Sequence, residues 1–587
     1  MSAQKMINLT MDGSRISVPE GTTIMEAAET IGVKIPRLCY HPDLSLAGSC
    51  RVCVVDVEDM GHYMAACSSA VWEGMRVRTH SPEIRQARRD IIELLLDNHP
   101  RDCQTCERDG HCELQDLAYA FGVRERLFEG RRKRFQIDDT SRSVVRDSEK
   151  CVLCGRCVRV CAEVQGVYNL DQQGRGFETV VAPASFAGMD ESACIQCGQC
   201  IAVCPVAAFI EPKHTEEVFA AIADPKKRVV VQTAPSIRSA IGEEFGMRPG
   251  TAVTGKMITA LRRIGVDVVF DTDLGADLTI VEESNELIDR LDKGGPLPMF
   301  TSCSPGWISF LEKFYPELIP HASTCRSPMT MLSVLTKTFY AEREGIDPKD
   351  IFMVAVMPCV AKKFESQRPE HYLAKDIPYT DAVVTTRELA WMIKSTGIDF
   401  VGLPEGEYDT PLGLSSGAGD IFGITGGVME ATLRTAAERL TGQPAERLDF
   451  AEVRHAKGIK EATIAIGDRE LRVAVANGLQ NAKTLLDAVS NKEKELDVIE
   501  VMACPGGCSG GGGQPYPSPG KYVLDPELLS ARGGALYEID SKKKLRLSHE
   551  NPAIKNLYEK FLGDIGGEKA RDLLHTRYAA RLPRGIR

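Results

Sequence analysis

The chain has 587 residues, 43% of them hydrophobic and 26% charged, which is enough apolar sequence for several cores. Its formal net charge of −11 argues against a general nucleic-acid binder, which would need a basic face. No apolar run is long enough to span a membrane, and the first residues carry no apolar export signal, so we expect a cytoplasmic protein. Disulfides rarely persist in that compartment, so the 20 cysteines are expected to bind metal.

Residues 5–80 alternate short β-type runs (INLTMDG, RISV and VCVVDVE) with turns, around one helical stretch, TTIMEAAETIG. This pattern predicts a small mixed α+β domain. Four cysteines in it have the spacing C-x10-C-x2-C-x13-C: Cys39, Cys50, Cys53 and Cys67. Four thiols with one CxxC pair could also hold zinc. The β-rich setting and the neighbouring cysteine sets favour a two-iron cluster.

Residues 82–98 (PEIRQARRDIIELLLDN) have the apolar spacing of an amphipathic helix. His99 follows this helix directly and precedes Cys103, Cys106 and Cys112. Three thiolates leave one corner of a four-iron cubane without a ligand, and the imidazole of His99 is placed to supply it. A neutral histidine makes such a cluster less negative, which raises its reduction potential.

Two similar units follow, CVLCGRCVRVCAE and CIQCGQCIAVCPV, and both have the two-cluster ferredoxin spacing C-x2-C-x2-C-x3-C. Three close thiolates wrap three corners of one cubane, and the fourth cysteine completes the other cubane. This logic predicts one cluster on Cys151, Cys154, Cys157 and Cys204, and a second on Cys194, Cys197, Cys200 and Cys161. Buried structural cysteines or two zinc sites are the alternatives, and the full duplication of the spacing counts against both.

From about residue 225 the pattern changes to apolar β-type runs such as RVVVQTAP, DVVFDT, IFMVAVMP, DAVVTT and LRVAVANG, separated by helical stretches. This alternation predicts an α/β domain with a substantial parallel sheet. Several candidate ligands directly follow these runs, so we expect a site at the carboxyl ends of strands.

Two resemblances extend this interpretation. Residues 5–210 resemble the large iron–sulfur subunit of respiratory complex I. The segments TSCSPGW at 301–307, MPCVAKKFE at 357–365 and EVMACPGGCSGGGGQP at 500–515 strongly resemble the three signature motifs of the iron-only (FeFe) hydrogenases. That family interconverts hydrogen with protons and electrons at an H-cluster. The resemblance implies a 4Fe–4S cubane joined through one cysteine to a two-iron subsite with carbonyl, cyanide and a bridging dithiolate amine.

The motifs imply roles for individual residues. Cys359, Cys504 and Cys508 would ligate the cubane, and Cys508 would bridge to the two-iron subsite. Glycines beside Cys508 would let the backbone approach a bulky cofactor. Lys362 would face a cyanide ligand with Glu365 positioning it. The remaining cofactor contacts would come from Pro235, Ser236, Met357 and Met502.

One position departs from the commonest family pattern. The first motif usually reads TSCCP, with a proton-relay thiol followed by a cubane ligand, whereas this chain has Cys303 followed by Ser304. Ser304 could ligate iron through oxygen, Cys303 could become the fourth thiolate, or the cubane could be incompletely ligated by protein. Cubanes prefer thiolate but turnover requires a relay thiol, so the role of Cys303 stays open.

The resemblance also implies a proton route to Cys303. Its members would be Glu283, Glu286 and Arg290 from VEESNELIDR at 281–290, with Ser323 from HASTCRSP. Without the resemblance, the EExxE pattern would indicate a solvated helix face. Cys325 matches no ligand position and is interpreted as a buried structural thiol.

The predicted architecture is multidomain: a β-grasp 2Fe–2S ferredoxin-like domain (1–82), a His/Cys3 4Fe–4S domain (83–140), a bacterial two-cluster ferredoxin domain (141–215) and a large α/β catalytic H-cluster domain (216–587). The predicted cofactors are one 2Fe–2S cluster, three 4Fe–4S clusters and the H-cluster.

The predicted function is reversible hydrogen oxidation and proton reduction. The N-terminus and Ser304 resemble catalytic subunits of multimeric, NAD(P)-linked and often electron-bifurcating hydrogenases, whose partner subunits carry flavin and nucleotide and which also use ferredoxin. A hydrogen sensor of the same fold, a monomeric ferredoxin-dependent hydrogenase and an electron-transfer subunit are the alternatives. A sensor would be expected to have an extra signalling domain or to lack Cys303, and the three motifs argue against the last.

Overall fold

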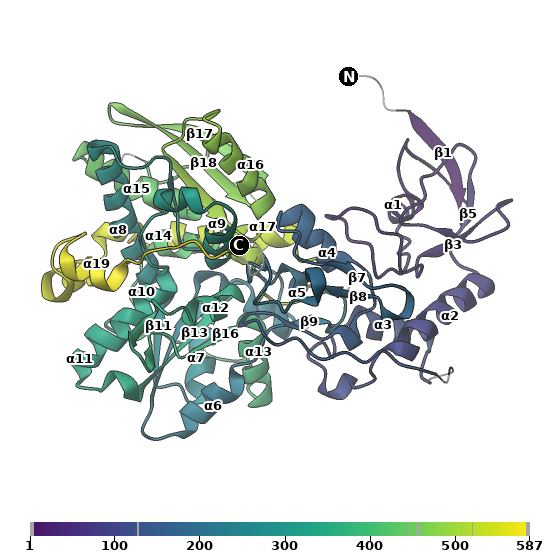
Figure 1. Cartoon of the computed structure of the whole chain (residues 1–587), viewed down its shortest axis with the longest axis horizontal. Helices are drawn as coiled ribbons and strands as arrows, with labels where there is room; N and C mark the ends of the chain where they lie inside the picture. The colour runs from purple at the N-terminus through teal and green to yellow at the C-terminus, as the bar shows by residue number, and fades with distance from the viewer. Residues whose placement is uncertain are drawn as a thin grey trace.

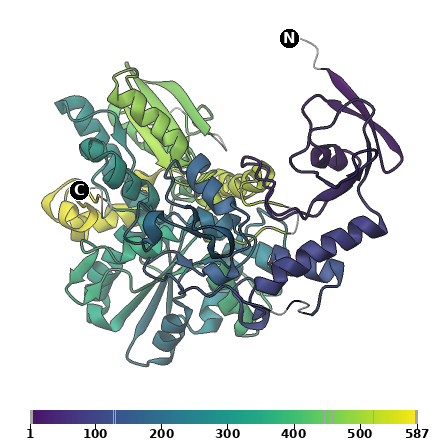
Figure 2. The same cartoon turned by 45° about the vertical axis from the view of Figure 1, so that its right-hand side comes forward.

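The computed structural model describes residues 5–125, 128, 130–444, 447–454, 458–518 and 521–582. Figures 1 and 2 show the N-terminal sheet at one end of the molecule, followed by a long helix, α2. The loop that carries Cys39 contacts the rest of the chain, since Arg159 donates a hydrogen bond to the carbonyl oxygen of Cys39 at 2.6 Å. In the described part of the chain, no helix combines the length and the apolar character needed to cross a membrane.

A five-stranded sheet with the order β2-β1-β5-β3-β4 forms the N-terminal unit. β1 pairs with β2 in antiparallel and with β5 in parallel orientation, and α1 packs on the sheet over a core that includes Cys53 and Cys67. Thr23 caps α1 in a reciprocal arrangement with Glu26, which is why the helix begins there. The elements are β1 Met6–Met11, β2 Ser14–Pro19, α1 Ile24–Glu29, β3 Val54–Val57, β4 Met64–Ala65 and β5 Arg76–Arg78.

The middle of the chain is built from short elements around the cysteine-rich units. α2 (Pro82–Asn98) begins at the Ser81 cap with Pro82 in its first turn and ends at His99, so the predicted helix at 82–98 is confirmed. The elements after it are α3 Glu113–Phe121, β6 Val145–Arg146, α4 Arg156–Arg159, β7 Asp171–Gln173, β8 Val180–Ala182, α5 Gln199–Val203 and β9 Phe209–Ile210.

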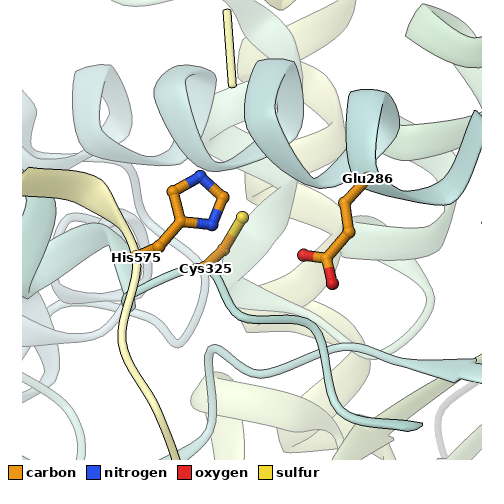
Figure 3. A group of neighbouring side chains, drawn as sticks. All are labelled: Glu286, Cys325 and His575. Atoms are coloured by element: carbon orange, nitrogen blue, oxygen red, sulfur yellow. The ribbon is translucent and has the colours of Figure 1, made fainter. Parts of the chain in front are cut away.

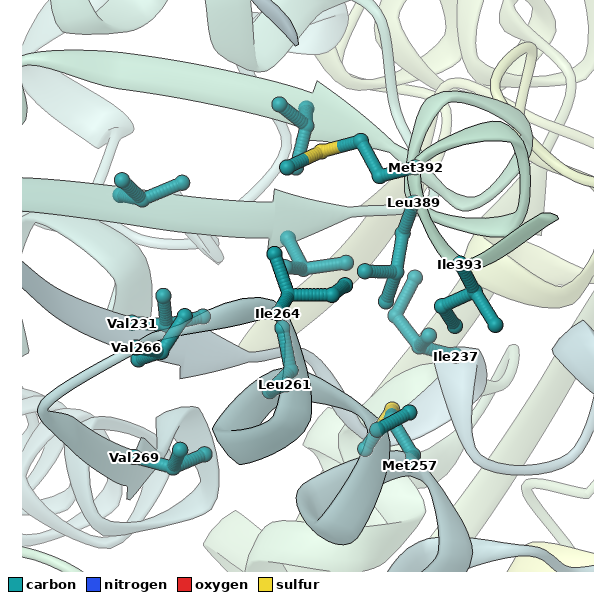
Figure 4. Close-up of a cluster of buried hydrophobic side chains, with 14 of the residues drawn as sticks. Val231, Ile237, Met257, Leu261, Ile264, Val266, Val269, Leu389, Met392 and Ile393 are labelled. Carbon is teal, nitrogen blue, oxygen red and sulfur yellow. The ribbon is translucent and has the colours of Figure 1, made fainter. Parts of the chain in front are cut away.

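The C-terminal part contains two four-stranded sheets. The first has the order β11-β10-β13-β16 with every pair parallel, which confirms the predicted parallel sheet. One of its faces packs against α7 and α13 through the apolar side chains of Figure 4, among them Met257, Leu261 and Ile393. The elements are α6 Thr215–Ala223, β10 Arg228–Thr233, α7 Thr254–Ile264, β11 Val268–Asp271, β13 Ile351–Met357, β16 Ala382–Thr385 and α13 Thr386–Ser395.

The second sheet has the order β12-β19-β18-β17 and is parallel except for the β17–β18 hairpin. α8 lies between the two sheets, because its apolar side chains enter one core with α10 and the first sheet and another with α15 and the second sheet. The elements are α8 Thr272–Lys293, β12 Met299–Phe300, α9 Pro305–Phe314, α10 Pro328–Leu335, α12 Ala361–Ser366, α15 Gly427–Thr441, β17 Gly458–Ile466, β18 Arg469–Asn477, α16 Leu479–Ser490, β19 Val498–Met502, α17 Pro526–Lys542, α18 Pro552–Leu557 and α19 Glu568–Leu574.

Candidate active site

Three predicted ligand thiols converge between the two sheets. Cys359 follows β13 of the first sheet, and Cys504 and Cys508 follow β19 of the second. Burial and the neighbouring thiols Cys359 and Cys508 raise the pKa of Cys504 well above its ordinary value. Burial, with Cys359 beside it, raises the pKa of Cys508 to about 12. The three predicted ligands therefore lie just beyond the carboxyl ends of strands, and thiols are the donors that iron–sulfur cubanes take.

The glycines around Cys508 serve close packing of the backbone. A Cβ at Gly511 would lie 2.3 Å from the carbonyl oxygen of Pro358, and one at Gly512 would lie 2.8 Å from the carbonyl oxygen of Gly198. A Cβ at Gly507 would lie 2.7 Å from the amide nitrogen of Thr425. The loop is thus pressed against the end of β13 and against the second ferredoxin-like unit, a contact that the sequence did not reveal.

Lys362 belongs to α12 and lies beside the ligand thiols Cys359 and Cys508. It is 8% exposed, and its Nζ is 2.6 Å from Oε2 of Glu365 and donates a hydrogen bond to the carbonyl oxygen of Cys303 at 3.2 Å. The other oxygen of Glu365 accepts hydrogen bonds from the hydroxyls of Ser327 and Thr330. Burial opposes the ionisation of Glu365, but Lys362 keeps the pKa of this carboxyl below its ordinary value. The pair is held in place, as the motif implied.

Cys303 and Ser304 lie between β12 and α9. Burial raises the pKa of the Cys303 thiol well above its ordinary value, and Glu283, Cys508 and Lys362 are its charged or thiol neighbours. The thiol therefore stays protonated at neutral pH and lies between the acidic helix α8 and the ligand loop. The Oγ of Ser304 accepts a hydrogen bond from the amide of Ala503 at 3.4 Å, which places it beside Cys504.

The other predicted cofactor contacts lie at the ends of neighbouring strands. Met357 and Met502 are the last residues of β13 and β19, and both are buried. Met502 and Cys303 belong to the same apolar core. Pro235 and Ser236 follow β10 and are buried, and Ser236 accepts hydrogen bonds from Nε2 of Gln514.

α8 carries the predicted proton route. Glu283 is 1% exposed, and burial raises the pKa of its carboxyl to about 8. Ser323 and the backbone of Ser302 are polar neighbours of this carboxyl group. Ser323 donates to Oε2 of Glu286 at 3.1 Å, and Arg290 holds Oε1 of Glu286 at 2.5 Å. The solvated-face interpretation of EExxE is wrong here, because both sheets pack around α8.

The outer end of this route opens into a cavity of about 590 Å³ lined by Glu286, Arg290, Thr324 and His575, among others. The Oγ1 of Thr324 lies 3.1 Å from Oε2 of Glu286 and 2.7 Å from Nδ1 of His575. Glu286 thus faces the cavity, whereas Glu283 faces Cys303.

The four cysteines of the first N-terminal set lie together in the structure. The thiol of Cys39 contacts those of Cys50 and Cys67, and Cys53 contacts Cys67. None of the N-terminal cysteine sets, all of which lie in the described part of the chain, brings three ligand atoms within 4.8 Å of one another.

His99 is 9% exposed, and burial lowers its pKa to about 4, so the imidazole is neutral, as a metal ligand must be. Its Nδ1 is buried without a hydrogen-bond partner among the described residues. Cys106 lies next to Cys103 and Cys112, and its sulfur is 3.7 Å from Nζ of Lys150.

The two ferredoxin-like units have the same backbone. Leu153 and Gln196 are both left-handed, with φ of 51° and 66°, and each donates its amide to the sulfur of the cysteine two residues earlier at 3.4 Å. Cys204 neighbours Cys151 and Cys154 of the other unit. In turn, Cys161 neighbours Cys194.

The second unit touches the active-site loop. Cys197 and Cys504 are neighbours. Gln165 donates to the carbonyl oxygen of Ala503 at 2.9 Å, and Gln199 donates to that of Gly510 at 3.0 Å. The second ferredoxin-like unit therefore packs directly against the loop that carries Cys504.

Sequence reasoning missed Glu500. This carboxylate is fully buried within β19, accepts amide hydrogen bonds from Gly426 and Met429 at 2.7 Å, and is a charged neighbour of Cys303. Burial raises its pKa to about 7. The signal available in the sequence was a single acid inside the apolar run VIEVM.

Comparison with known proteins decides the family. The model described as "Iron only hydrogenase large subunit, C-terminal domain" matches residues 227–512. The chain is 48% identical to "NADP-reducing hydrogenase subunit HndD" of Solidesulfovibrio fructosivorans, over 98% of this chain and 99% of that protein. The chain belongs to the iron-only hydrogenase family.

Two further matches agree with this family assignment. It is 40% identical to "Iron hydrogenase 1" of Clostridium pasteurianum over 98% of this chain and all of that one. The solved structure of a variant of the apo FeFe-hydrogenase HydA1 from Chlamydomonas reinhardtii covers 63% of this chain and 99% of its own, at 45% identity and a TM-score of 0.57.

Domain models match the N-terminal part and the C-terminal end of the hydrogenase. A "2Fe-2S iron-sulfur cluster binding domain" matches 4–82, an "NADH-ubiquinone oxidoreductase-G iron-sulfur binding region" matches 88–126, and a "4Fe-4S dicluster domain" matches 150–208. An "Iron hydrogenase small subunit" model matches 526–581. The predicted family, enzyme class and order of iron–sulfur domains before a catalytic domain are confirmed.

Proposed function

We propose that hydrogen turnover takes place where Cys359, Cys504 and Cys508 converge, with Cys303 and Lys362 beside them. One observation carries the proposal: the ferredoxin-like unit reaches this point through Cys197 and the buried acid Glu283 reaches it from α8. Electrons and protons are thereby delivered to the same place by separate parts of the fold.

The residues present fit an H-cluster. Three thiols converge, of which Cys504 is buried and Cys359 and Cys508 are half-buried. The buried cation of Lys362 faces the same space, as a cofactor with anionic ligands requires. Cys359, Cys504 and Cys508 would hold the cubane, Ser304 or Cys303 is the fourth protein group nearby, and Pro235, Ser236, Met357 and Met502 would enclose the two-iron part. When bound, the cluster supplies the metal chemistry that forms or splits hydrogen.

The chain itself moves the protons. Glu286 exchanges protons with the outer cavity, Ser323 passes them inward, Glu283 holds one near neutral pH, and Cys303 presents it to the active site. The pKa of about 8 that burial gives Glu283 suits a group that must both accept and release a proton at pH 7. Arg290 keeps the carboxylate of Glu286 oriented.

We further propose the full electron chain and the domain limits. One 2Fe–2S cluster would be held by Cys39, Cys50, Cys53 and Cys67 in a β-grasp domain at 1–82, supported by the mixed sheet and α1. A 4Fe–4S cluster would be held by His99, Cys103, Cys106 and Cys112 at 83–140. Two more would be held by the crossed sets of the repeated unit at 141–215, supported by the contacts of Cys204 and Cys161 with the opposite unit. Residues 216–587 would form the catalytic domain.

The test of the active site uses the anaerobic holoenzyme. Its infrared spectrum is expected to show carbonyl and cyanide stretches, and a reduced dye is expected to drive hydrogen evolution. Glu283→Gln keeps the size of the side chain but cannot carry a proton as an acid, so turnover should fall by about 10²–10⁴-fold with the infrared bands retained. Wild-type turnover in Glu283→Gln would refute the route, and the absence of the bands would refute the H-cluster.

We also propose that the hydrogenase is the catalytic subunit of a multimeric, NAD(P)-linked and electron-bifurcating assembly that also exchanges electrons with ferredoxin. The relative named as an NADP-reducing hydrogenase subunit and the match of residues 88–126 to a complex I-type region support this. Native purification should yield a flavoprotein partner and NAD(P)H-dependent hydrogen evolution that requires it. A lone polypeptide with full ferredoxin-dependent activity would contradict the proposal.

A further inference from the structure

Cys325 has no part in the proposed turnover. It belongs to an apolar core with side chains of α8 and α10, yet carboxylates of α8 also lie near it. It is 0% exposed, and its segment pairs with the chain after α19: Arg326 donates its amide to Leu574, and Thr576 donates its amide to Thr324, both at 2.8 Å. This pairing brings His575 next to Cys325, and Figure 3 shows a ring nitrogen of His575 directed toward the sulfur.

Glu286 of α8 completes the group. One ligand atom from each of Glu286, Cys325 and His575 lies within 4.8 Å of the others, and among the described residues this is the only such group of three. A thiol, an imidazole and a carboxylate together make the donor set typical of zinc. We propose that Glu286, Cys325 and His575 bind a zinc-class divalent cation, and that the occupied site closes the outer end of the proton route. The closing effect rests on the proposed route through Glu286.

The surroundings provide entry and support. Glu286 and His575 line the cavity of about 590 Å³, so a hydrated cation can reach them and keep a water ligand. Bond lengths of about 2.0–2.3 Å place zinc ligands about 3.5 Å apart, so small side-chain rotations are sufficient. Oε2 of Glu282 lies 3.2 Å from Nε2 of His575. A carboxylate beside the second ring nitrogen orients many metal-bound imidazoles.

Binding would displace existing contacts at Glu286. The Thr324 hydroxyl now joins Nδ1 of His575 to Oε2 of Glu286, and a cation would take its place. Ser323 donates to the same oxygen, so the cation competes directly with the step that passes protons inward. Arg290 would stay seated, because it also donates to the carbonyl oxygens of Pro296, His321 and Ala322.

The thiol adds a pH dependence. Burial and the nearby carboxylates, Glu286 first among them, raise the pKa of Cys325 well above its ordinary value, so the cation must displace a proton. Zinc affinity should therefore increase with pH. Magnesium prefers oxygen ligands in octahedral geometry and should not bind at this site.

The experiment adds zinc chloride to the anaerobic holoenzyme and records both turnover and the zinc K-edge absorption spectrum, which the iron clusters do not obscure. The spectrum is expected to show one sulfur at about 2.3 Å together with nitrogen and oxygen at about 2.0–2.2 Å. Cys325→Ser should remove the sulfur signal, and both Cys325→Ser and His575→Gln should raise the half-inhibitory zinc concentration at least about tenfold. His80→Gln, which removes a histidine with an 81% exposed side chain, is the matched control and should change nothing.

The outcomes separate the two proposals. A wild-type zinc spectrum without sulfur, or one that Cys325→Ser leaves unchanged, overturns the site, and His575→Gln decides the matter if the first variant does not fold. Zinc bound through sulfur with turnover unaffected supports the site and contradicts the proton route through Glu286. Equal inhibition by magnesium chloride overturns the assignment of a soft-metal site.

Discussion

The buried ion pair of Lys362 and Glu365 gives the sharpest quantitative prediction. In Glu365→Gln, the amide oxygen can still accept from Ser327 and Thr330, but no protein carboxylate pairs with an ammonium that is 8% exposed. Of its two protein hydrogen bonds, Lys362 would keep the 3.2 Å bond to the carbonyl of Cys303. Removing one partner of a buried pair costs about 3–5 kcal/mol of folding stability. The ammonium should also lose its fixed position beside the ligand thiols.

The adjacent pair of Lys363 and Glu388 is the matched control. It is equally buried, with Nζ of Lys363 2.9 Å from Oε2 of Glu388, but it lies on the β16 side of α12 and makes no contact with the ligand thiols. Both Glu365→Gln and Glu388→Gln should lower the denaturation midpoint. Only Glu365→Gln should lower hydrogen evolution per iron-loaded, folded enzyme and shift the infrared bands.

Two results would refute this reasoning. If Glu365→Gln kept its denaturation midpoint and its turnover, the pair would not be holding a buried charge in place. If both variants lost turnover to the same degree, the effect would be general destabilisation, and Lys362 would have no special relation to the active site.

Two further predictions concern packing and pH. Gly511→Ala should lose iron and turnover, because its Cβ would lie 2.3 Å from the Pro358 carbonyl oxygen and overpacking costs about 1–3 kcal/mol of folding stability. Gly534→Ala in α17 is the control: its Cβ has open space, so it should be neutral or stabilise the fold by up to about 1 kcal/mol. Iron content and turnover of the two variants check this, and full activity in Gly511→Ala would contradict it. Burial lowers the pKa of His214 to about 4 from its ordinary 6.5, so the stability due to its neutral form is present above pH 6.5 and is lost as the pH falls toward 4. The denaturation midpoint of the wild type should therefore fall more steeply with acid than that of His214→Gln, and parallel pH profiles would count against this.

The local features of this hydrogenase followed from its sequence. The helix at 82–98 has its cap, its proline and its apolar spacing within one segment, and it formed as predicted. The paired ferredoxin-like units are equally local, because their cysteines are separated by only two or three residues and the same left-handed positions shape both loops. The apolar runs also formed strands, since their composition suits a sheet that is buried on both faces.

Contacts between segments that are far apart in the chain could not be predicted from local sequence patterns. Cys359 and Cys504 were assigned together only through family motifs, and the close packing of their loops depends on glycines whose neighbours come from other segments. The residue pattern around Glu283 is typical of a solvated helix face, and only the family motif indicated another role; its burial comes from the packing of both sheets around α8. Glu500 was missed for the same reason, because its partners lie at the start of α15.

Cys325 shows most clearly the difference between what the sequence determines and what only the tertiary structure decides. The sequence alone determined which thiols belong to repeated, closely spaced ligand sets, because chain connectivity fixes the distance between near neighbours. It assigned Cys325 no partner, since Glu286 and His575 are brought to it from α8 and from the chain after α19. Only the tertiary structure decided that meeting, because the packing of helices on two sheets sets which distant side chains share a buried, weakly screened space.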